Sequence, residues 1–260
     1  MPKLSPVHAH ERVDLRITPL RRGTYVPMGS PASSRPAARV QLGLYVGTVA
    51  YLAMALACLR QAGTARPWSR LDFFSGGFLA LLLISAGIGL LFGRRLFGSS
   101  DALRQAAGMT YDRATLLIAP ALTAGDALVF LDYGRWHLTR ALEQAPLQAV
   151  GLTLGAAAMA WIVRTDAQLV RHFEDARSAQ ALMTTGPFRH IRHPRYAGIL
   201  GVRAASALTF ASTIGWMLAA AWLIVLLRRM RLEEAHLQAE FGDGYARYAA
   251  RTSRLIPGLY

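Results

Sequence analysis

A short segment in the second half of the chain combines residue types that could perform polar chemistry at a membrane surface. The sequence TGPFRHIRHPRYAGIL, residues 185–200, places three Arg, two His and a Tyr directly before an apolar run. A second charged cluster follows later, in RMRLEEAHLQAEFGDGYARY, and it contains the adjacent carboxylates Glu233 and Glu234. Guanidinium, imidazole and carboxylate groups together can bind a ligand that carries charges of both signs.

The two clusters share one site only if the apolar stretch between them folds back. Residues 196–227 are almost entirely apolar, and we expect a helical hairpin with its turn near residues 212–215. Each leg is shorter than the roughly 20 residues that a span needs, so the helices must extend into the flanking basic segments, tilt, or thin the bilayer locally. Both clusters would then return to the same membrane face.

The composition is that of an integral membrane protein. Hydrophobic residues make up 53% of the chain, charged residues 17%, and the mean hydropathy is +0.27, which is too apolar for an ordinary soluble domain. The net charge of +14 would suit nucleic acid or anionic lipid, but in a membrane chain we interpret it as topology and expect no nucleic-acid partner. The single Cys58 lies in an apolar run, which argues against a disulfide framework or a Cys-based metal site.

The apolar stretches predict an all-α, polytopic bundle of about six transmembrane helices. The first four stretches are Val40–Leu59, Phe73–Phe92, Thr115–Leu131 and Leu147–Val163, and residues 196–227 supply the last two. With six spans and both termini cytosolic, 23 of the 29 Lys and Arg fall on the inner side, in agreement with the positive-inside rule. We therefore expect an integral protein of a bacterial-type inner (cell) membrane, with a cytosolic C-terminal tail.

The two clusters also carry a resemblance to a known family. GPFRHIRHPRYAG, the apolar stretch, and RMRLEEAHLQAEFGDGYARYAARTSRLIPG together resemble the C-terminal half of the isoprenylcysteine carboxyl methyltransferase and phospholipid methyltransferase superfamily. The general family pattern is GPYRYVRHPxYxG, a hairpin, and EExxLxxxFGxxYxxY, and Phe188 stands where Tyr is commoner. The match covers about Leu147–Gly258. The resemblance implies a membrane enzyme that uses S-adenosylmethionine.

The expected domain organisation follows from the resemblance and the apolar stretches. Residues 1–39 contain six Pro and no long apolar run, and we expect a basic, disordered N-terminal arm. Residues 40–146 would form the N-terminal transmembrane helices. Residues 147–260 would form a methyltransferase-like transmembrane core that ends in the cytosolic tail.

The resemblance also implies roles for individual residues. In the family the His and Tyr of RHPxY and the Glu pair contact the cofactor, which implies these roles for the matching residues here. The expected cofactor-binding residues are Gly186, Pro187, Phe188, Arg192, His193, Pro194, Tyr196, Glu233 and Glu234. Arg192 or His193 would hold the carboxylate of S-adenosylmethionine, and a Glu would accept from its ammonium or ribose. The expected catalytic residues are Arg229, Glu233 and Arg203, and no metal is expected.

Several of these residues have simpler interpretations. Arg192 at a membrane edge is typical of topology and lipid contact, and Arg229 with Glu233 at i, i+4 is typical of a surface ion pair. Arg203 lies at i+7 from Tyr196, and family acceptors are often lipid carboxylates, so it could bind an anionic acceptor. Alternatively it pairs with Asp126, a residue that we interpret first as an interhelical anchor, or it snorkels.

The sequence as a whole favours a membrane methyltransferase that moves a methyl group from S-adenosylmethionine to a lipophilic acceptor. A carboxylate of an isoprenoid-type or other lipid is the favoured acceptor, and a phospholipid, amine or thiol is the alternative. A membrane NADPH-dependent sterol-type reductase has a similar RHPNYxGE segment, but here Gly198 is followed by Ile199 rather than an acidic residue. A non-catalytic membrane protein is the third reading. The expected partners are the acceptor and membrane lipid, with no obligate protein partner.

Overall fold

A computed structural model describes most of the chain beyond its N-terminal region. The described residues are 46–58, 68–98, 113–136, 138, 144–174 and 181–258. The predicted N-terminal arm, residues 1–39, lies outside them.

The described residues confirm the predicted all-α class. A helix at Val46–Cys58 is followed by α2 (Trp68–Gly98), α4 (Arg113–Ala124), α5 (Asp126–Leu131), the π-helical turn η1 (Asp132–Trp136), α6 (Ala145–Glu174), the 3-10 turn η3 (Gly186–Arg189), α7 (Pro194–Thr209), α8 (Thr213–Phe241) and α9 (Asp243–Ala249). Within the described part of the chain, the one β-type pairing is an isolated parallel bridge between Ile191 and Ser253.

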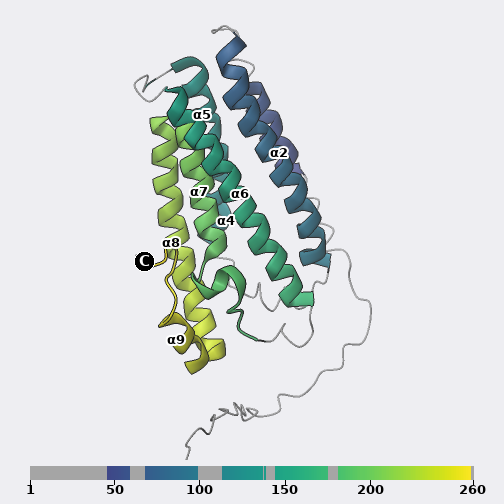
Figure 1. The fold of residues 1–260 in the computed structure, drawn as a ribbon, viewed down its shortest axis with the longest axis vertical. Helices are drawn as coiled ribbons and strands as arrows, with labels where there is room; N and C mark the ends of the chain where they lie inside the picture. Colours follow the sequence, from purple (N-terminus) through teal and green to yellow (C-terminus); the bar gives the residue numbers. More distant parts are fainter. Residues whose placement is uncertain are drawn as a thin grey trace, which may run out of the picture. The chain divides into compact units, whose positions relative to one another are not determined.

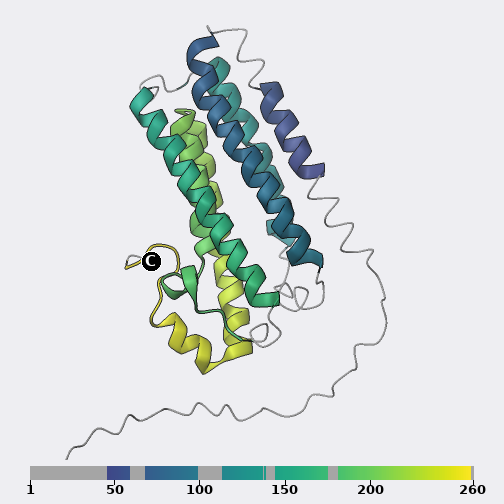
Figure 2. The ribbon, with the colours of Figure 1, turned by 45° about the vertical axis from the view of Figure 1, so that its right-hand side comes forward.

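The long helices lie side by side. Figures 1 and 2 show α2, α6, α7 and α8 running along the same axis. α6 packs against both α2 and α7, and α8 packs against α7 and α4. Small residues bring α6 and α7 close together: a Cβ on Gly198 would lie 2.5 Å from Cγ1 of Ile162, and one on Gly151 would lie 2.5 Å from the backbone nitrogen of Thr209. Such contacts are typical of helices that pack inside a membrane.

Three helices are long and apolar enough to cross a membrane, within the residues that the structure describes. They are Leu117–Trp136, Ala145–His172 and Thr213–Phe241, and shorter apolar helices lie at Val46–Cys58 and Phe73–Ile88. The chain is therefore an integral membrane protein by the length and composition of its helices. The count of six spans stays a prediction.

A three-residue connection joins α7 to α8. Ser212 caps α8 by accepting a hydrogen bond from the Gly215 backbone nitrogen at 3.2 Å, and its hydroxyl donates to the buried Asp132 at 2.5 Å. Gly215 itself lies against Ala207, where a Cβ would come 2.8 Å from the Ala207 Cα. The chain thus reverses tightly, and the start of α7 lies beside the later turns of α8.

An aromatic cluster surrounds this reversal. The ring of Phe210 meets Phe78, Phe130 and Tyr133 edge to face, with centroids 5.1–5.3 Å apart. All four side chains are buried. Edge-to-face pairs add about 0.5–1.5 kcal/mol each beyond the burial of their area. The cluster fixes α7 and α8 to α2 and α5 at the end of the bundle away from α9.

The close contact at Gly151 gives a first testable prediction. We expect Gly151→Ala to lower the stability of the detergent-purified protein by about 1–3 kcal/mol, because the new methyl group meets backbone atoms that cannot turn aside. Thermal unfolding followed by circular dichroism measures the change. Gly76→Ala is the matched control, since a Cβ there has no neighbour within 4 Å, and it should leave the transition unchanged or raise it slightly. Equal effects at both positions would contradict the packing argument.

Candidate functional site

Two prolines and one glycine determine the backbone path of the basic segment, residues 185–195. Gly186 has φ +61°, a left-handed conformation that favours glycine, and a Cβ there would lie 1.8 Å from the Gln168 side-chain oxygen. Pro187 is the second residue of η3, and Pro194 begins α7, where the missing N–H costs no helical hydrogen bond. Trp161 on α6 donates to the Pro194 carbonyl at 2.8 Å. The segment between the two prolines is therefore held in a non-α-helical path.

The C-terminal segment, residues 250–258, forms backbone hydrogen bonds with the basic segment. Arg192 donates from its backbone nitrogen to the Ser253 carbonyl at 2.8 Å, and His193 donates to the Arg254 carbonyl at 3.0 Å. The Ser253 nitrogen donates in turn to the His190 carbonyl at 3.3 Å. The Tyr248 hydroxyl, on α9, donates to the Phe188 carbonyl at 2.7 Å. Segments far apart in sequence are thus fixed together around His193.

Glu234 is the acceptor for three cationic side chains. Nε of Arg192 lies 2.9 Å from its carboxylate, Nη2 of Arg254 lies 2.7 Å away, and Nε2 of His193 lies 3.2 Å away. The Arg192 guanidinium also donates to the carbonyls of Ala249 and Thr252. Arg192 and Glu234 are largely buried, with 13% of each side chain exposed. The pair therefore ties α8 to both the basic segment and the C-terminal segment.

Glu233 has its own set of partners. The Tyr196 hydroxyl donates to its carboxylate, Nε of Arg229 lies 2.8 Å from it, and Nδ1 of His193 lies 3.6 Å away. The rings of His193 and Tyr196 stack with centroids 5.5 Å apart and an interplanar angle of 10°. We call Arg192, His193, Tyr196, Arg229, Glu233, Glu234 and Arg254 the polar cluster.

The position of His193 favours its protonated form. Each ring nitrogen faces a carboxylate, and only the imidazolium can donate on both sides. Burial of the ring works against the charge, but hydrogen bonding to Glu233 and Glu234 outweighs it and raises the pKa of His193. The cluster then holds four cationic side chains against two carboxylates, a surplus of positive charge.

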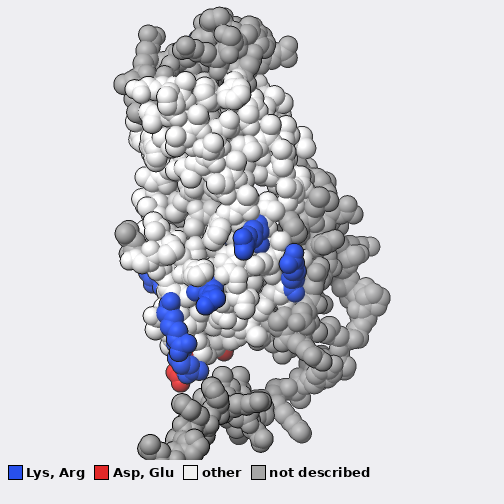
Figure 3. Space-filling model, viewed as in Figure 1, with Lys and Arg blue, Asp and Glu red and all other residues white. Residues whose placement is uncertain are grey.

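On the face shown in Figure 3, the charged side chains gather toward one end of the bundle. In Figure 3 the Lys and Arg side chains of the described residues lie over the lower half of the molecule, toward the end where Figure 1 shows α9. The upper half of that face shows no charged side chain among the described residues. A polar end beside an apolar bundle is the arrangement that a membrane-surface site requires.

The structure brings together most of the residues that the sequence predicted. Arg192, His193, Tyr196, Glu233 and Glu234 meet directly, with the predicted Arg229 beside them. The other predicted cofactor residues, Gly186, Pro187, Phe188 and Pro194, form the backbone path on which these side chains stand.

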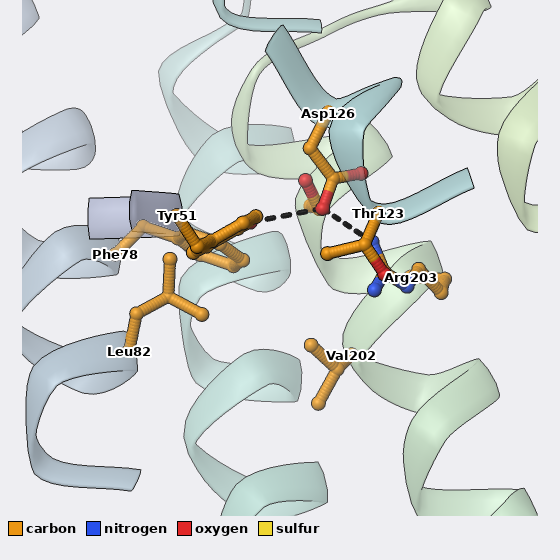
Figure 4. Close-up of a pocket in the computed structure, with 8 residues that line it drawn as sticks. Tyr51, Phe78, Leu82, Thr123, Asp126, Val202 and Arg203 are labelled. Atoms are coloured by element: carbon orange, nitrogen blue, oxygen red, sulfur yellow. Dashed lines mark hydrogen bonds and ion pairs between the residues drawn. The ribbon is translucent and has the colours of Figure 1, made fainter. Parts of the chain in front are cut away.

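Arg203 is the one predicted site residue that lies elsewhere. It is seven residues beyond Tyr196 on α7, roughly 10 Å further along the helix. Its guanidinium pairs with Asp126, and Tyr51 donates to the same carboxylate at 2.9 Å (Figure 4). This pairing is the alternative that the sequence left open.

Two residues of the site were missed from sequence. Arg254 binds Glu234, and its signal was available, since the resemblance included the closing RLIPG segment that begins with this residue. Gln168 had no sequence signal. Its buried side-chain oxygen lies next to Gly186 and has no hydrogen-bond partner among the described residues.

Comparison with known proteins identifies the segment that carries the cluster. Residues 144–244 match the family described as phospholipid methyltransferase, which confirms the resemblance predicted from sequence. The matched segment contains α6, α7 and α8 and all of the polar cluster except Arg254. The family therefore suggests methyltransferase chemistry for this part of the chain.

A curated relative shares part of the chain. The cobalt-zinc-cadmium resistance protein CzcN of Cupriavidus metallidurans is 32% identical over 84 residues, which cover 32% of this chain and 38% of the relative. The match thus spans less than two-fifths of the relative's length. Among the residues that the structure describes, no group of three or more His, Cys, Asp or Glu is placed to hold a metal ion.

The doubly paired His193 predicts a pH-dependent stability. Because its folded pKa is raised above the ordinary value of 6.5, the stabilisation is fully present below that value and is lost as the pH rises through the raised pKa. We expect the thermal unfolding temperature of purified protein to fall across this window. At low pH the substitution His193→Gln should lower the free energy of unfolding by roughly 3–5 kcal/mol. The unfolding temperature of this variant should also lack the pH-dependent step.

The same substitution at an exposed histidine of α8 provides the control. His236→Gln should retain the pH step of the unmodified protein, because His236 lies outside the polar cluster. A step that survives in His193→Gln, or disappears in His236→Gln, would show that another group is responsible.

Proposed function

We propose that the chain is a membrane-embedded methyltransferase that uses S-adenosylmethionine, because the polar cluster lies within the segment that matches the phospholipid methyltransferase family. That coincidence is the observation that carries the proposal. In the expected six-span topology, 23 of the 29 Lys and Arg lie on the same membrane side as the cluster, which supports a cytosolic position for it.

The residues of the cluster fit the chemistry of S-adenosylmethionine. The arginines Arg192 and Arg254 suit its carboxylate, and the carboxylates of Glu233 and Glu234 suit its ammonium group and ribose hydroxyls. Gln168 adds an unsatisfied acceptor beside Gly186. When bound, the cofactor supplies an electrophilic methyl group that a nucleophile takes by in-line displacement. The Tyr196 ring, stacked on His193, would present an electron-rich aromatic face to a positive sulfur.

The role of the protein is to position the reactants and exclude water. The backbone pairing between the basic segment and the C-terminal segment fixes His193, and the carboxylates fix its ring on both sides. Arg229 and Tyr196 hold Glu233 in place. Such restraint keeps the cluster's geometry when one partner is exchanged for a ligand group.

The charge of the cluster favours an anionic acceptor. Four cationic side chains face two carboxylates, so the surplus positive charge would attract a lipid carboxylate. A carboxylate is already ionised and requires no general base. For an amine or thiol acceptor, Glu233 would be the first candidate to accept the proton.

The CzcN match does not change the proposed reaction. That relative's name refers to metal resistance, and the described residues of this chain offer no matching set of metal ligands.

Cofactor binding tests the role of the cluster. We expect calorimetric titration of the purified protein with S-adenosylmethionine to show binding, and Glu233→Gln or Tyr196→Phe to weaken it about tenfold, because each removes a charge-assisted hydrogen bond. Glu240→Gln, at an exposed carboxylate of the same helix, should bind as the unmodified protein does. Binding of NADPH in place of S-adenosylmethionine would favour a reductase and overturn the proposal.

Methyl transfer tests the reaction itself. Purified protein with labelled S-adenosylmethionine and a total membrane-lipid extract should yield a labelled lipid, and a base-labile label would identify a carboxyl ester. Label that resists base would reject the carboxylate acceptor and favour an amine or thiol. No labelled lipid from a protein that binds the cofactor would contradict a lipophilic acceptor.

A further inference from the structure

A second polar site lies within the apolar part of the bundle. A cavity of about 170 Å³ is lined by residues from five helices, among them Tyr51, Thr123, Asp126, Arg203 and Ser206 (Figure 4). Apolar side chains complete its wall, including Phe78, Leu82 and Val202. It lies apart from the polar cluster, since Arg203 is seven residues beyond Tyr196 on α7. The proposed function assigns this cavity no role.

The charges of the cavity cancel within it. Arg203 pairs with Asp126, and Tyr51 donates to the same carboxylate oxygen. The Arg203 guanidinium also lies 4.9 Å from the ring centroid of Trp222. A further anion would leave a net negative charge at membrane depth, which is unfavourable there. A neutral ligand would leave the pair balanced.

One hydrogen-bond donor of Arg203, a residue that lines the cavity, has no partner among the described residues. This donor is the buried Nε. Thr123 donates to the Ala119 carbonyl at 2.9 Å, which leaves its hydroxyl oxygen able to accept. Leaving a buried donor unpaired is costly, so a ligand oxygen that accepts from Nε would be favoured.

The size of the cavity limits what it holds. Whole small-molecule sites measure roughly 300–1,000 Å³, whereas this cavity would hold about five or six waters at about 30 Å³ each. It accommodates the polar end of a molecule whose remainder lies outside. In a bundle of apolar helices, that remainder would be a hydrocarbon chain in the bilayer.

We propose that this cavity binds the uncharged, oxygen-bearing end of a membrane lipophile, an ester carbonyl or a hydroxyl, through Arg203. The sequence alone suggested an anionic partner for Arg203, and the Asp126 pairing argues instead for a neutral one. The inference does not rest on methyl transfer, because lipophile binding is measured without a methyl donor.

Photolabelling of the full chain in detergent tests the ligand class. The probes are a fatty methyl ester, the matching primary alcohol, the matching alkyl sulfonate and the hydrocarbon, each with the same mid-chain diazirine. We expect the ester and alcohol to label peptides around the cavity saturably, with competition by unlabelled ester. Saturable labelling by the sulfonate that equals the ester's, or no saturable labelling by any probe, would overturn the proposal.

Two variants test the role of the cavity residues. Arg203→Lys keeps a cation beside Asp126 but removes the Nε donor, and we expect the ester's affinity to fall about threefold to tenfold. Arg195→Lys is the matched control on the same helix, where the arginine side chain is 57% exposed, and should bind the ester normally. Val202→Phe fills the cavity without changing a polar group, so unlabelled ester should no longer compete with the ester probe in this variant. This test does not depend on whether Arg203→Lys folds. Unchanged binding in Val202→Phe would overturn the assignment.

Discussion

The imidazolium of His193 between Glu233 and Glu234 is the interaction on which the polar end of the structure depends. Two adjacent carboxylates, both largely buried, would repel each other without a cation between them. Arg229 and Arg192 flank the pair from α8 and from the basic segment. Because loss of one member leaves a buried charge unpaired, the cluster behaves as one unit rather than as separate surface ion pairs.

This unit requires the chain reversal at the far end of α7. His193 and Glu234 are adjacent only because three residues turn the chain and α8 then runs back along α7. Ser212, held by Asp132, and the aromatic contacts of Phe210 fix that turn. Local restraint at one end of the bundle therefore determines the geometry of charged groups at the other end.

The sequence predicted the helical class and most of the cluster, because hydrophobic runs and the RHPRY and EE motifs are local signals. Arg254 was missed although its motif was recognised, since its contact with Glu234 depends on how the C-terminal segment returns to the bundle. The Ile191 and Ser253 bridge, which directs that return, has no sequence pattern. Gln168 was invisible for the same reason: its closeness to Gly186 arises from tertiary packing.

Arg203 illustrates why helical periodicity alone does not place a charged residue in three dimensions. An i+7 spacing places it on the same face as Tyr196, but two turns along an α-helix separate the two by roughly 10 Å. At that depth its nearest carboxylate is Asp126, from a different helix, and the ion pair forms between α5 and α7. The polar cluster and the Arg203–Asp126 pair thus differ in character. The end cluster keeps surplus positive charge, whereas the pair at depth is neutral, as a low-dielectric environment demands.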